Sequence, residues 1–297
     1  MEGIVVVLKP PGMTSSDVVN DIKKIFNVKK AGHTGTLDPG AAGVLPVCIG
    51  RATRLFDYVI EENKEYIGEI AFGKKTDTQD SYGAVTAQCE CSVTAAQVEE
   101  AARGFIGKYM QRVPMYSAVK YKGKKLYELA RSNISIESKI REVEIHEISL
   151  LDSSGPQRFL MRISCSKGTY IRTLMEDIGR RLNAHAHLSF LLRTGTGKFS
   201  IEKAVTIDEL LRLKDKGMLR SALTPVENAI SHLPSIRLSG MDAGRKKLLC
   251  NGAKIEVTSD FDNASVRVYD DCFIGVGRIE NGFLQMKLLL REPADDK

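Results

Sequence analysis

The chain has 297 residues, of which 43% are hydrophobic and 27% charged, with a formal net charge of +6. These proportions are typical of a soluble globular protein, and the length suffices for one large domain or for a large and a small one. A membrane-spanning protein is excluded, since no apolar run approaches the roughly 18 residues that a bilayer span requires.

The N-terminal segment predicts a buried strand followed by a helix. Residues 3–10 (GIVVVLKP) form an apolar, β-branched run that two consecutive prolines end. Apolar residues at helical spacing follow from Val18 to Phe26, with Ser15 or Ser16 as the expected helix cap. The acid at position 2 and an apolar core of only about five residues do not fit a signal peptide, so we expect a cytoplasmic protein.

A glycine-rich segment at residues 31–50 (AGHTGTLDPGAAGVLPVCIG) contains a single carboxylate, Asp38. An aspartate before proline in such a segment is commonly a turn former. The hydroxyls of Thr34 and Thr36 and the absence of a second acid favour another interpretation. Nucleophilic or general-base catalysis needs one ionised carboxylate on a stiff element, so Asp38 is a candidate catalytic residue. His33 is close in sequence, and we expect it to help or pack rather than to act as a base.

Two further segments carry candidate site residues. Residues 64–73 (KEYIGEIAFG) are strand-like, and Tyr66 near their start could be either a core aromatic or a stacking platform. Residues 158–182 change from alternating strand to helix, and Tyr170 and Arg172 lie at the change, where both could point into a cleft. A guanidinium there could pair with a carboxylate and hold it ionised, or it could simply be a surface donor.

The excess of basic residues is concentrated in residues 103–142, which contain ten lysines and arginines against three acids. Four tyrosines are interleaved with them, at positions 109, 116, 121 and 127. A basic segment with aromatics suits nucleic acid, because its phosphates pair with the cations and its bases stack on the rings. A solvated, lysine-rich surface explains the same composition, and this segment alone does not decide between the two.

The remaining elements predict helices and then short strands. Capping-box sequences open two helices, after Thr94 and after Thr206. Past the prolines at 225 and 234, the chain changes to short strand-like segments separated by glycine and Asn-Gly turns. We therefore expect an α+β fold, with a larger domain over residues 1–228 and a small β-rich domain over residues 229–297.

Other motifs do not predict a metal or a nucleotide. Residues 193–199 (RTGTGKF) resemble a phosphate loop, but Leu192 and Phe199 stand where that motif requires glycine and serine or threonine. Cys89 and Cys91 form one C-x-C pair without a second pair or a nearby histidine, so we expect no zinc site. The six cysteines are expected to be free thiols.

Six segments together carry a family resemblance: LKPPGMTS (8–15), GHTGTLDPGAAGVLPVCIGRATR (32–54), KEYIGEIAFGKKTDTQDSYG (64–83), PMYSAVKYKGKKLYELAR (114–131), CSKGTYIRTL (165–174) and LLRTGTGKF (191–199). Their order and spacing are similar to those of the TruB family, the tRNA pseudouridine synthases that act on the T-loop uridine. The resemblance covers residues 3–228, and the motif around Asp38 is highly specific. The C-terminal residues resemble the small RNA-binding PUA-type domain of bacterial members by position and composition.

The resemblance implies a pseudouridine-synthase fold, in which helices and loops flank a central mixed, largely antiparallel sheet, with a small β-rich PUA-like domain at the C terminus. It also implies a reaction. Uridine at position 55 in the T loop of tRNA would be flipped out, and its glycosidic bond would be broken and re-formed as a C-glycoside. No cofactor and no metal would be required. A carboxylate could either attack covalently or remove the C2′ proton to give a glycal, and the family favours the glycal.

The same resemblance implies roles for the candidate residues. Asp38 would be the catalytic aspartate, and Arg172 would pair with it. Tyr66 would stack on the flipped uracil, Tyr170 would lie close to C5 and the sugar, and Leu191 would form an apolar wall of the pocket.

Further residues would support or extend that site. His33 would enter the space left by the flipped base, Lys9 and Pro10 would support the site, and Asp80 would contact displaced nucleotides. The partner would be tRNA, through its T-arm stem-loop. The residues expected to contact the RNA backbone are Lys122, Lys124 and Lys125.

Two other functions compete with this enzyme. One is a tRNA-binding chaperone with incidental activity, and the other is a synthase that modifies guide-RNA-selected sites within a protein complex, as archaeal and eukaryotic relatives do. The complete set of site residues favours an active enzyme, and the self-contained length favours a stand-alone protein. We therefore expect no obligatory protein partner, no membrane association and, from the family, a monomer.

Overall fold

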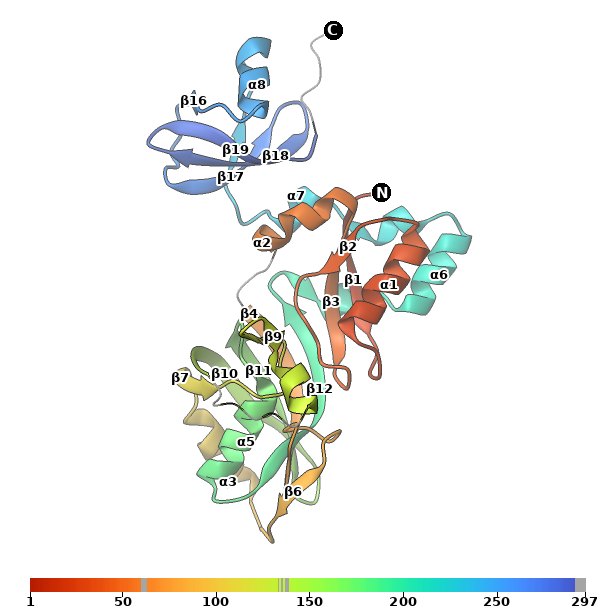
Figure 1. Ribbon diagram of the computed structural model, residues 1–297, viewed down its shortest axis with the longest axis vertical. Coiled ribbons are helices and arrows are strands. Elements are labelled where there is room, and N and C mark those ends of the chain that lie inside the picture. The colour runs from red at the N-terminus through yellow and green to blue at the C-terminus, as the bar shows by residue number, and fades with distance from the viewer. Residues whose placement is uncertain (60–62, 133, 135, 137–138, 292–297) are drawn as a thin grey trace.

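The structure is a computed structural model that describes residues 1–59, 63–132, 134, 136 and 139–291. Within these ranges the strands form a ten-stranded sheet, a five-stranded sheet and two short two-stranded sheets. The ten-stranded sheet runs through the lower and middle parts of the molecule in Figure 1, and the five-stranded sheet lies at the upper end. The predicted α+β class is confirmed.

The larger sheet is mixed and largely antiparallel, as expected. Among its described strands, neighbours pair antiparallel except β3 and β12, which pair in parallel through Leu192 with Ala42 and Arg193 with Gly43. This seam brings the end of the glycine-rich segment against β12. Across the sheet the strands are β14 (Leu223–Thr224), β1 (Gly3–Lys9), β3 (Ala42–Ile49), β12 (Ala186–Thr196), β4 (Asn63–Phe72), β11 (Arg158–Ser166), β10 (Ile140–Gly155) and β7 (Gly107–Arg112), with β2 (Ala31–His33) beside β3 and β13 (Phe199–Ser200) beside β12.

Helix α1 (Ser15–Phe26) buries the predicted apolar face, but its cap differs from the expectation. Thr14 is the cap: its hydroxyl accepts a hydrogen bond from the Asp17 amide, and the Asp17 carboxylate accepts one from the Thr14 amide. Ser15 instead points at the glycine-rich segment, where its hydroxyl donates to the Leu37 carbonyl and accepts from the Leu37 amide. The expected caps Ser15 and Ser16 are therefore wrong, because the adjacent threonine completes a reciprocal pair with an acid three residues on.

The other predicted helices are present. α3 (Ala95–Arg103) has the expected capping box, α5 (Ile171–Arg181) follows β11, and α6 (Ile207–Asp215) is capped by Thr206. α5 packs against β12 and α3, and α1 packs against α6 and β2. The shorter described helices are η1 (Gly50–Leu55), α2 (Phe56–Val59), α4 (Leu126–Arg131), η2 (Ile201–Lys203), η3 (Leu219–Ala222) and α7 (Val226–Ala229).

The C-terminal sheet confirms the predicted β-rich part and adds a helix that was not expected. Its strands, in order, are β15 (Ser235–Arg237), β17 (Ala264–Tyr269), β18 (Phe273–Glu280), β19 (Phe283–Leu289) and β16 (Ile255–Glu256). The added helix, α8 (Ala243–Cys250), buries only Leu249 fully and therefore has no apolar stripe to predict it. The two remaining hairpins are β5 (Lys74–Thr76) with β6 (Val85–Gln88) and β8 (Lys120–Tyr121) with β9 (Lys124–Lys125).

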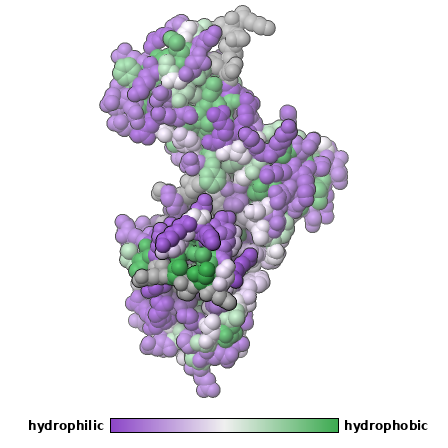
Figure 2. Space-filling model, in the orientation of Figure 1, coloured by the Kyte–Doolittle hydropathy of each residue, from purple (hydrophilic) through white to green (hydrophobic). Residues whose placement is uncertain are grey.

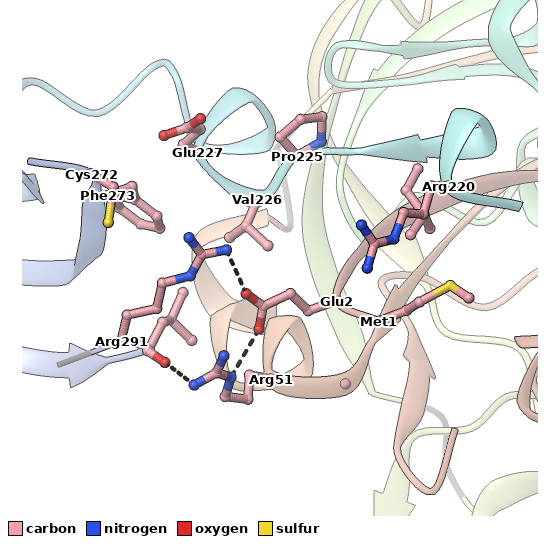
Figure 3. Close-up of a pocket in the computed structure, with 13 residues that line it drawn as sticks. Met1, Glu2, Arg51, Arg220, Pro225, Val226, Glu227, Cys272, Phe273 and Arg291 are labelled. Carbon is pink, nitrogen blue, oxygen red and sulfur yellow. Dashed lines mark hydrogen bonds and ion pairs between the residues drawn. The ribbon is translucent and has the colours of Figure 1, made fainter. Parts of the chain in front are cut away.

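The two sheets meet at a polar junction near the N terminus (Figure 3). The Glu2 carboxylate accepts hydrogen bonds from Arg51 at 2.9 Å and from Arg291 at 3.0 Å, beside a cavity of about 680 Å³. Beneath it, one apolar cluster joins Ile4 of β1, Ile230 and residues of β18 and β19. Residues around position 229 thus belong to the junction itself, and the boundary between residues 228 and 229 stays a prediction.

Hydrophilic side chains cover most of the face shown in Figure 2. None of the helices in the described part of the chain is both long and apolar enough to cross a membrane.

Candidate active site

The segment that carries Asp38 is held rigidly between β2 and β3. The Lys9 ammonium donates to the Pro39 carbonyl at 3.2 Å, and the Gly12 amide donates to the same carbonyl at 2.8 Å. On the other side of Asp38, Leu37 is held by Ser15 as described above. The flanking backbone is thus fixed on both sides, while the Asp38 side chain remains 40% exposed.

Arg172 contacts Asp38 directly. Its Nε lies 2.9 Å from Asp38 Oδ2, and the arginine side chain is only 5% exposed. Its other donors are used by the chain: Nη1 donates to the Thr78 carbonyl at 2.8 Å and Nη2 to the Tyr116 carbonyl at 2.9 Å. Two segments far apart in sequence therefore hold the guanidinium, and the guanidinium orients the carboxylate. The ion pair expected between Arg172 and Asp38 is present.

The ion pair borders a cavity of about 220 Å³ that five of the predicted site residues line. Asp38, Tyr66, Tyr170, Arg172 and Leu191 all line it. They come from the glycine-rich segment, β4, the start of α5 and β12, which the seam between β3 and β12 brings together. An exposed carboxylate beside two tyrosine rings and an apolar wall can bind a planar base and act on the group attached to it.

Tyr66 belongs to the wall of this cavity rather than to the surface. Its side chain is buried, and burial raises the pKa of Tyr66 to about 12, so its hydroxyl stays protonated at neutral pH. Tyr170 is the residue before α5 and is half-buried, and its amide donates to Gln111 Oε1 at 2.8 Å. The backbone of Tyr170 is thereby tied to β7.

Three predicted residues, Lys9, His33 and Asp80, do not line the cavity. Lys9 is fully buried and donates to the carbonyls of Pro10, Met13 and Pro39, and burial lowers the pKa of Lys9 to about 8. This geometry suits a support for the segment that carries Asp38. His33 lies in β2, where burial and then the charge of Arg193 lower its pKa.

Asp80 lies on the other side of Arg172. Its Oδ2 is 3.7 Å from Arg172 Nη1, and its Oδ1 accepts hydrogen bonds from the Thr78 hydroxyl and the Tyr82 amide. Asp80 lines a shallow notch together with Asp38, Arg172 and Leu191. The notch and the cavity therefore share the ion pair as a common wall.

Sequence reasoning missed Arg193, which supports the site from below. It is 1% exposed, and it donates to the carbonyls of Val44, Gly35 and Thr36 at 2.8, 3.2 and 3.4 Å. β12 passes so close that a Cβ on Gly43, whose φ is +120°, would lie 2.2 Å from the Arg193 carbonyl oxygen. Arginine is rarely buried, so the only available signal was its place in a motif that resembles a phosphate loop.

Some side chains of the basic segment, residues 103–142, lie at the surface and others pack against the core. Lys122 and Lys124 are exposed and Lys125 is half-buried, on the β8–β9 hairpin and at the start of α4. Two of their ammonium groups lie over tyrosine rings, Lys122 over Tyr121 and Lys125 over Tyr127. Tyr109, by contrast, packs edge-on against Phe105 beneath the sheet. The described residues contain no group of three or more acidic, histidine or cysteine side chains that could hold a metal ion.

Family comparisons match nearly the whole chain. Residues 23–171 match the TruB family pseudouridylate synthase N-terminal domain, residues 172–231 the tRNA pseudouridylate synthase B C-terminal domain, and residues 234–290 the pseudouridine synthase II TruB C-terminal domain. The chain is 41% identical to the tRNA pseudouridine synthase B of Caldanaerobacter subterraneus subsp. tengcongensis, over 97% of this chain and 99% of that protein. It is 49% identical to the protein of the same name from Pelotomaculum thermopropionicum, over 80% of this chain and 76% of that protein.

Solved structures agree with these matches. A Cbf5–Nop10–Gar1 complex contains a chain that superposes with a TM-score of 0.73 at 27% identity, covering 98% of this chain and 85% of that one. An H/ACA RNP bound to a substrate RNA containing 2′-deoxyuridine contains another, with a TM-score of 0.72 at 25% identity, covering 97% and 85%. With its fold, its three family matches and its close relatives in agreement, the chain belongs to the TruB family of pseudouridylate synthases.

Proposed function

We propose that the protein isomerises a uridine of tRNA to pseudouridine, at position 55 in the T loop. The observation that carries this proposal is the Asp38–Arg172 ion pair on the wall of a cavity that Tyr66, Tyr170 and Leu191 also line. The relatives' name, tRNA pseudouridine synthase B, supports tRNA as the substrate.

The proposed reaction moves one bond and needs neither oxidant nor cofactor. The bond between N1 and C1′ breaks, the uracil turns, and a bond between C5 and C1′ forms. N1 gains a proton, and C5 loses its proton to solvent. Asp38 acts on the sugar, either by attacking C1′ or by removing the C2′ proton to give a glycal that later regains it. We favour the glycal, as the family resemblance implies, and in either route the contact with Arg172 would hold the carboxylate in one orientation.

The other site residues would bind the flipped uridine. Tyr66 would stack on the uracil, a contact worth about 1–3 kcal/mol. Tyr170 would lie close to C5 and the sugar, and Leu191 would close the apolar side of the cavity. His33, on β2, would fill the space that the base leaves, and Asp80 would contact neighbouring nucleotides.

Binding must also offset the cost of flipping, which is a few kcal/mol and smallest for a base in a loop. Lys122, Lys124 and Lys125 would pair with backbone phosphates of the T arm, and the C-terminal domain would extend the grip. We propose that the protein does this in the cytoplasm as a monomer without an obligatory protein partner. A tRNA-folding role could accompany the chemistry, and a chaperone with incidental activity is the alternative function.

A direct test is to incubate the protein with a synthetic T-arm stem-loop, digest the RNA to nucleosides and separate pseudouridine from uridine by chromatography. The proposal predicts about one pseudouridine per loop at completion, and none when cytidine replaces the target uridine. A loop that is bound tightly yet contains only uridine would favour the chaperone alternative. Conversion of a different uridine would support the reaction but refute the position.

A further inference from the structure

Two large aromatic side chains are exposed next to Asp38, on the side away from Tyr66 and Tyr170. Tyr82 is 72% exposed and Phe190 is 46% exposed. Both line the shallow notch that Asp38, Asp80 and Arg172 also line. Exposed aromatic surface is unfavourable in water, so two such rings at the edge of an active site point to a ligand that covers them.

Tyr82 is held firmly, although its ring is in solvent. The Ser81 amide donates to the Leu188 carbonyl at 3.1 Å and the Tyr82 amide to Asp80 Oδ1 at 3.0 Å, which fix the loop on β12. The ring lies against Gly40, where a Cβ would be only 2.0 Å from Tyr82 Cε2. The tyrosine thus packs on the segment that carries Asp38, while 72% of its surface remains exposed.

Phe190 approaches the notch from β12. It immediately precedes Leu191, which lines both the notch and the catalytic cavity. A planar group that extends from the catalytic cavity past Asp38 and Leu191 into the notch would meet Phe190 and Tyr82, because both rings line the notch.

We propose that Tyr82 and Phe190 form a stacking subsite for the unpaired base of a nucleotide next to the target nucleotide. The inference rests on the proposed function, since it needs an RNA loop in the catalytic cavity. The charges favour a base over a phosphate, because the notch contains two carboxylates and one guanidinium that is already paired. Asp80 Oδ2 can accept a hydrogen bond from the N–H groups at the edge of adenine, cytosine or guanine.

The test combines protein variants with altered RNA. Wild type, Tyr82→Ala, Tyr82→Phe and the double variant Tyr82→Ala with Phe190→Ala are assayed on the T-arm stem-loop. Two further loops have an abasic residue on either the 5′ or the 3′ side of the target uridine. The readouts are the dissociation constant and the single-turnover rate at saturating RNA. A matched control is Leu211→Ala, which removes an apolar side chain of similar exposure from α6.

The subsite predicts that Tyr82→Ala weakens binding of the intact loop by about 5- to 30-fold, the lower part of the range for one stacked base. The single-turnover rate should stay within about threefold, and Tyr82→Phe and Leu211→Ala should bind like wild type. Wild type should bind one of the two abasic loops more weakly than the intact loop, by a similar factor. The double variant should bind that abasic loop and the intact loop with equal affinity.

Three results would overturn the inference. If the double variant binds the intact loop within twofold of wild type, no base stacks on the two rings. An abasic effect of full size in the double variant shows that the missing base binds elsewhere. Wild type that binds the loop without forming pseudouridine removes the proposed function, and the subsite with it. Either of the first two results, obtained with active wild type, removes the subsite alone.

Discussion

Replacing Arg172 with lysine separates the charge of this residue from its geometry. The guanidinium reaches the Asp38 carboxylate and the carbonyls of Thr78 and Tyr116, all within 2.9 Å. A lysine ammonium is a single donor centre on a shorter reach, so Arg172→Lys leaves about two of these acceptors without their donor. An acceptor left without its donor away from water costs about 1–3 kcal/mol, so two of them predict a loss of at most roughly 2–6 kcal/mol in the free energy of unfolding.

The same substitution should also slow the reaction in the protein that remains folded. The Asp38 carboxylate is 40% exposed and owes its orientation to the arginine. Displacing a reacting group by about 1 Å costs roughly 100-fold in rate, so single-turnover pseudouridine formation should fall by about that factor while RNA affinity changes only a few-fold. Urea unfolding gives the stability, and quenched-flow sampling of the labelled stem-loop gives the rate.

Arg180→Lys is the matched control for this experiment. Arg180 is on the same helix, α5, and its 67% exposed side chain pairs with Glu176 and Asp177, whose side chains are 10% and 13% exposed. A lysine at this exposed position keeps the positive charge beside both acids, so this variant should lose at most about 1 kcal/mol and react like wild type. If Arg172→Lys reacted within tenfold of wild type at unchanged stability, the guanidinium would not be what positions Asp38.

Three further predictions concern RNA binding, stacking and the junction. Neutralising Lys122, Lys124 and Lys125 together should weaken RNA binding. It should also make the dependence of log affinity on log salt less steep, by about one for each phosphate that these lysines contact. A salt titration with an unchanged slope would show that they do not bind the RNA backbone. Tyr66→Phe should keep most of the single-turnover rate and Tyr66→Leu should lose about 10-fold or more, since stacking needs the ring and not the hydroxyl. For Glu2, burial raises the pKa, but hydrogen bonds from two arginines outweigh it and lower the pKa overall. The stabilisation from Glu2 is therefore fully present above its ordinary pKa and is lost as the pH falls through the lowered value. Wild type and Glu2→Gln should then differ in urea unfolding at pH 7 and become equally stable in acid. A difference in stability that persisted in acid would contradict this assignment.

The local patterns predicted several elements of the fold because those elements obey local rules. β1 is a continuous apolar run and α3 begins with its own capping box, so neighbouring residues contain the information. The contact between Asp38 and Arg172 joins residues far apart in sequence, and composition or periodicity could not have found it. It was expected because a specific family motif surrounds each residue, and the structure contains it.

The features that were missed depend on tertiary contacts. Arg193 is buried because the glycine-rich segment offers it three carbonyl oxygens, and no local pattern indicates that. Helix α8 turns a mostly polar surface to solvent and has no apolar stripe. Tyr109 was grouped with the nucleic-acid-binding aromatics because of its basic neighbours, but the pairing of β7 with β10 turns it under the sheet against Phe105. In each case the side chain's environment comes from a segment distant in sequence.

The most direct test is the release of tritium from a T-arm stem-loop labelled at C5 of the target uridine. Forming the bond between C5 and C1′ expels the label, so its appearance in water reports this reaction and no other step of binding. Wild type should release one equivalent, and Asp38→Asn should release none while its RNA affinity stays within a few-fold of wild type. Asp38→Asn that retained a tenth of the wild-type rate would show that Asp38 is not the catalytic residue, and wild type that bound the loop and released nothing would show that the protein does not act on this uridine.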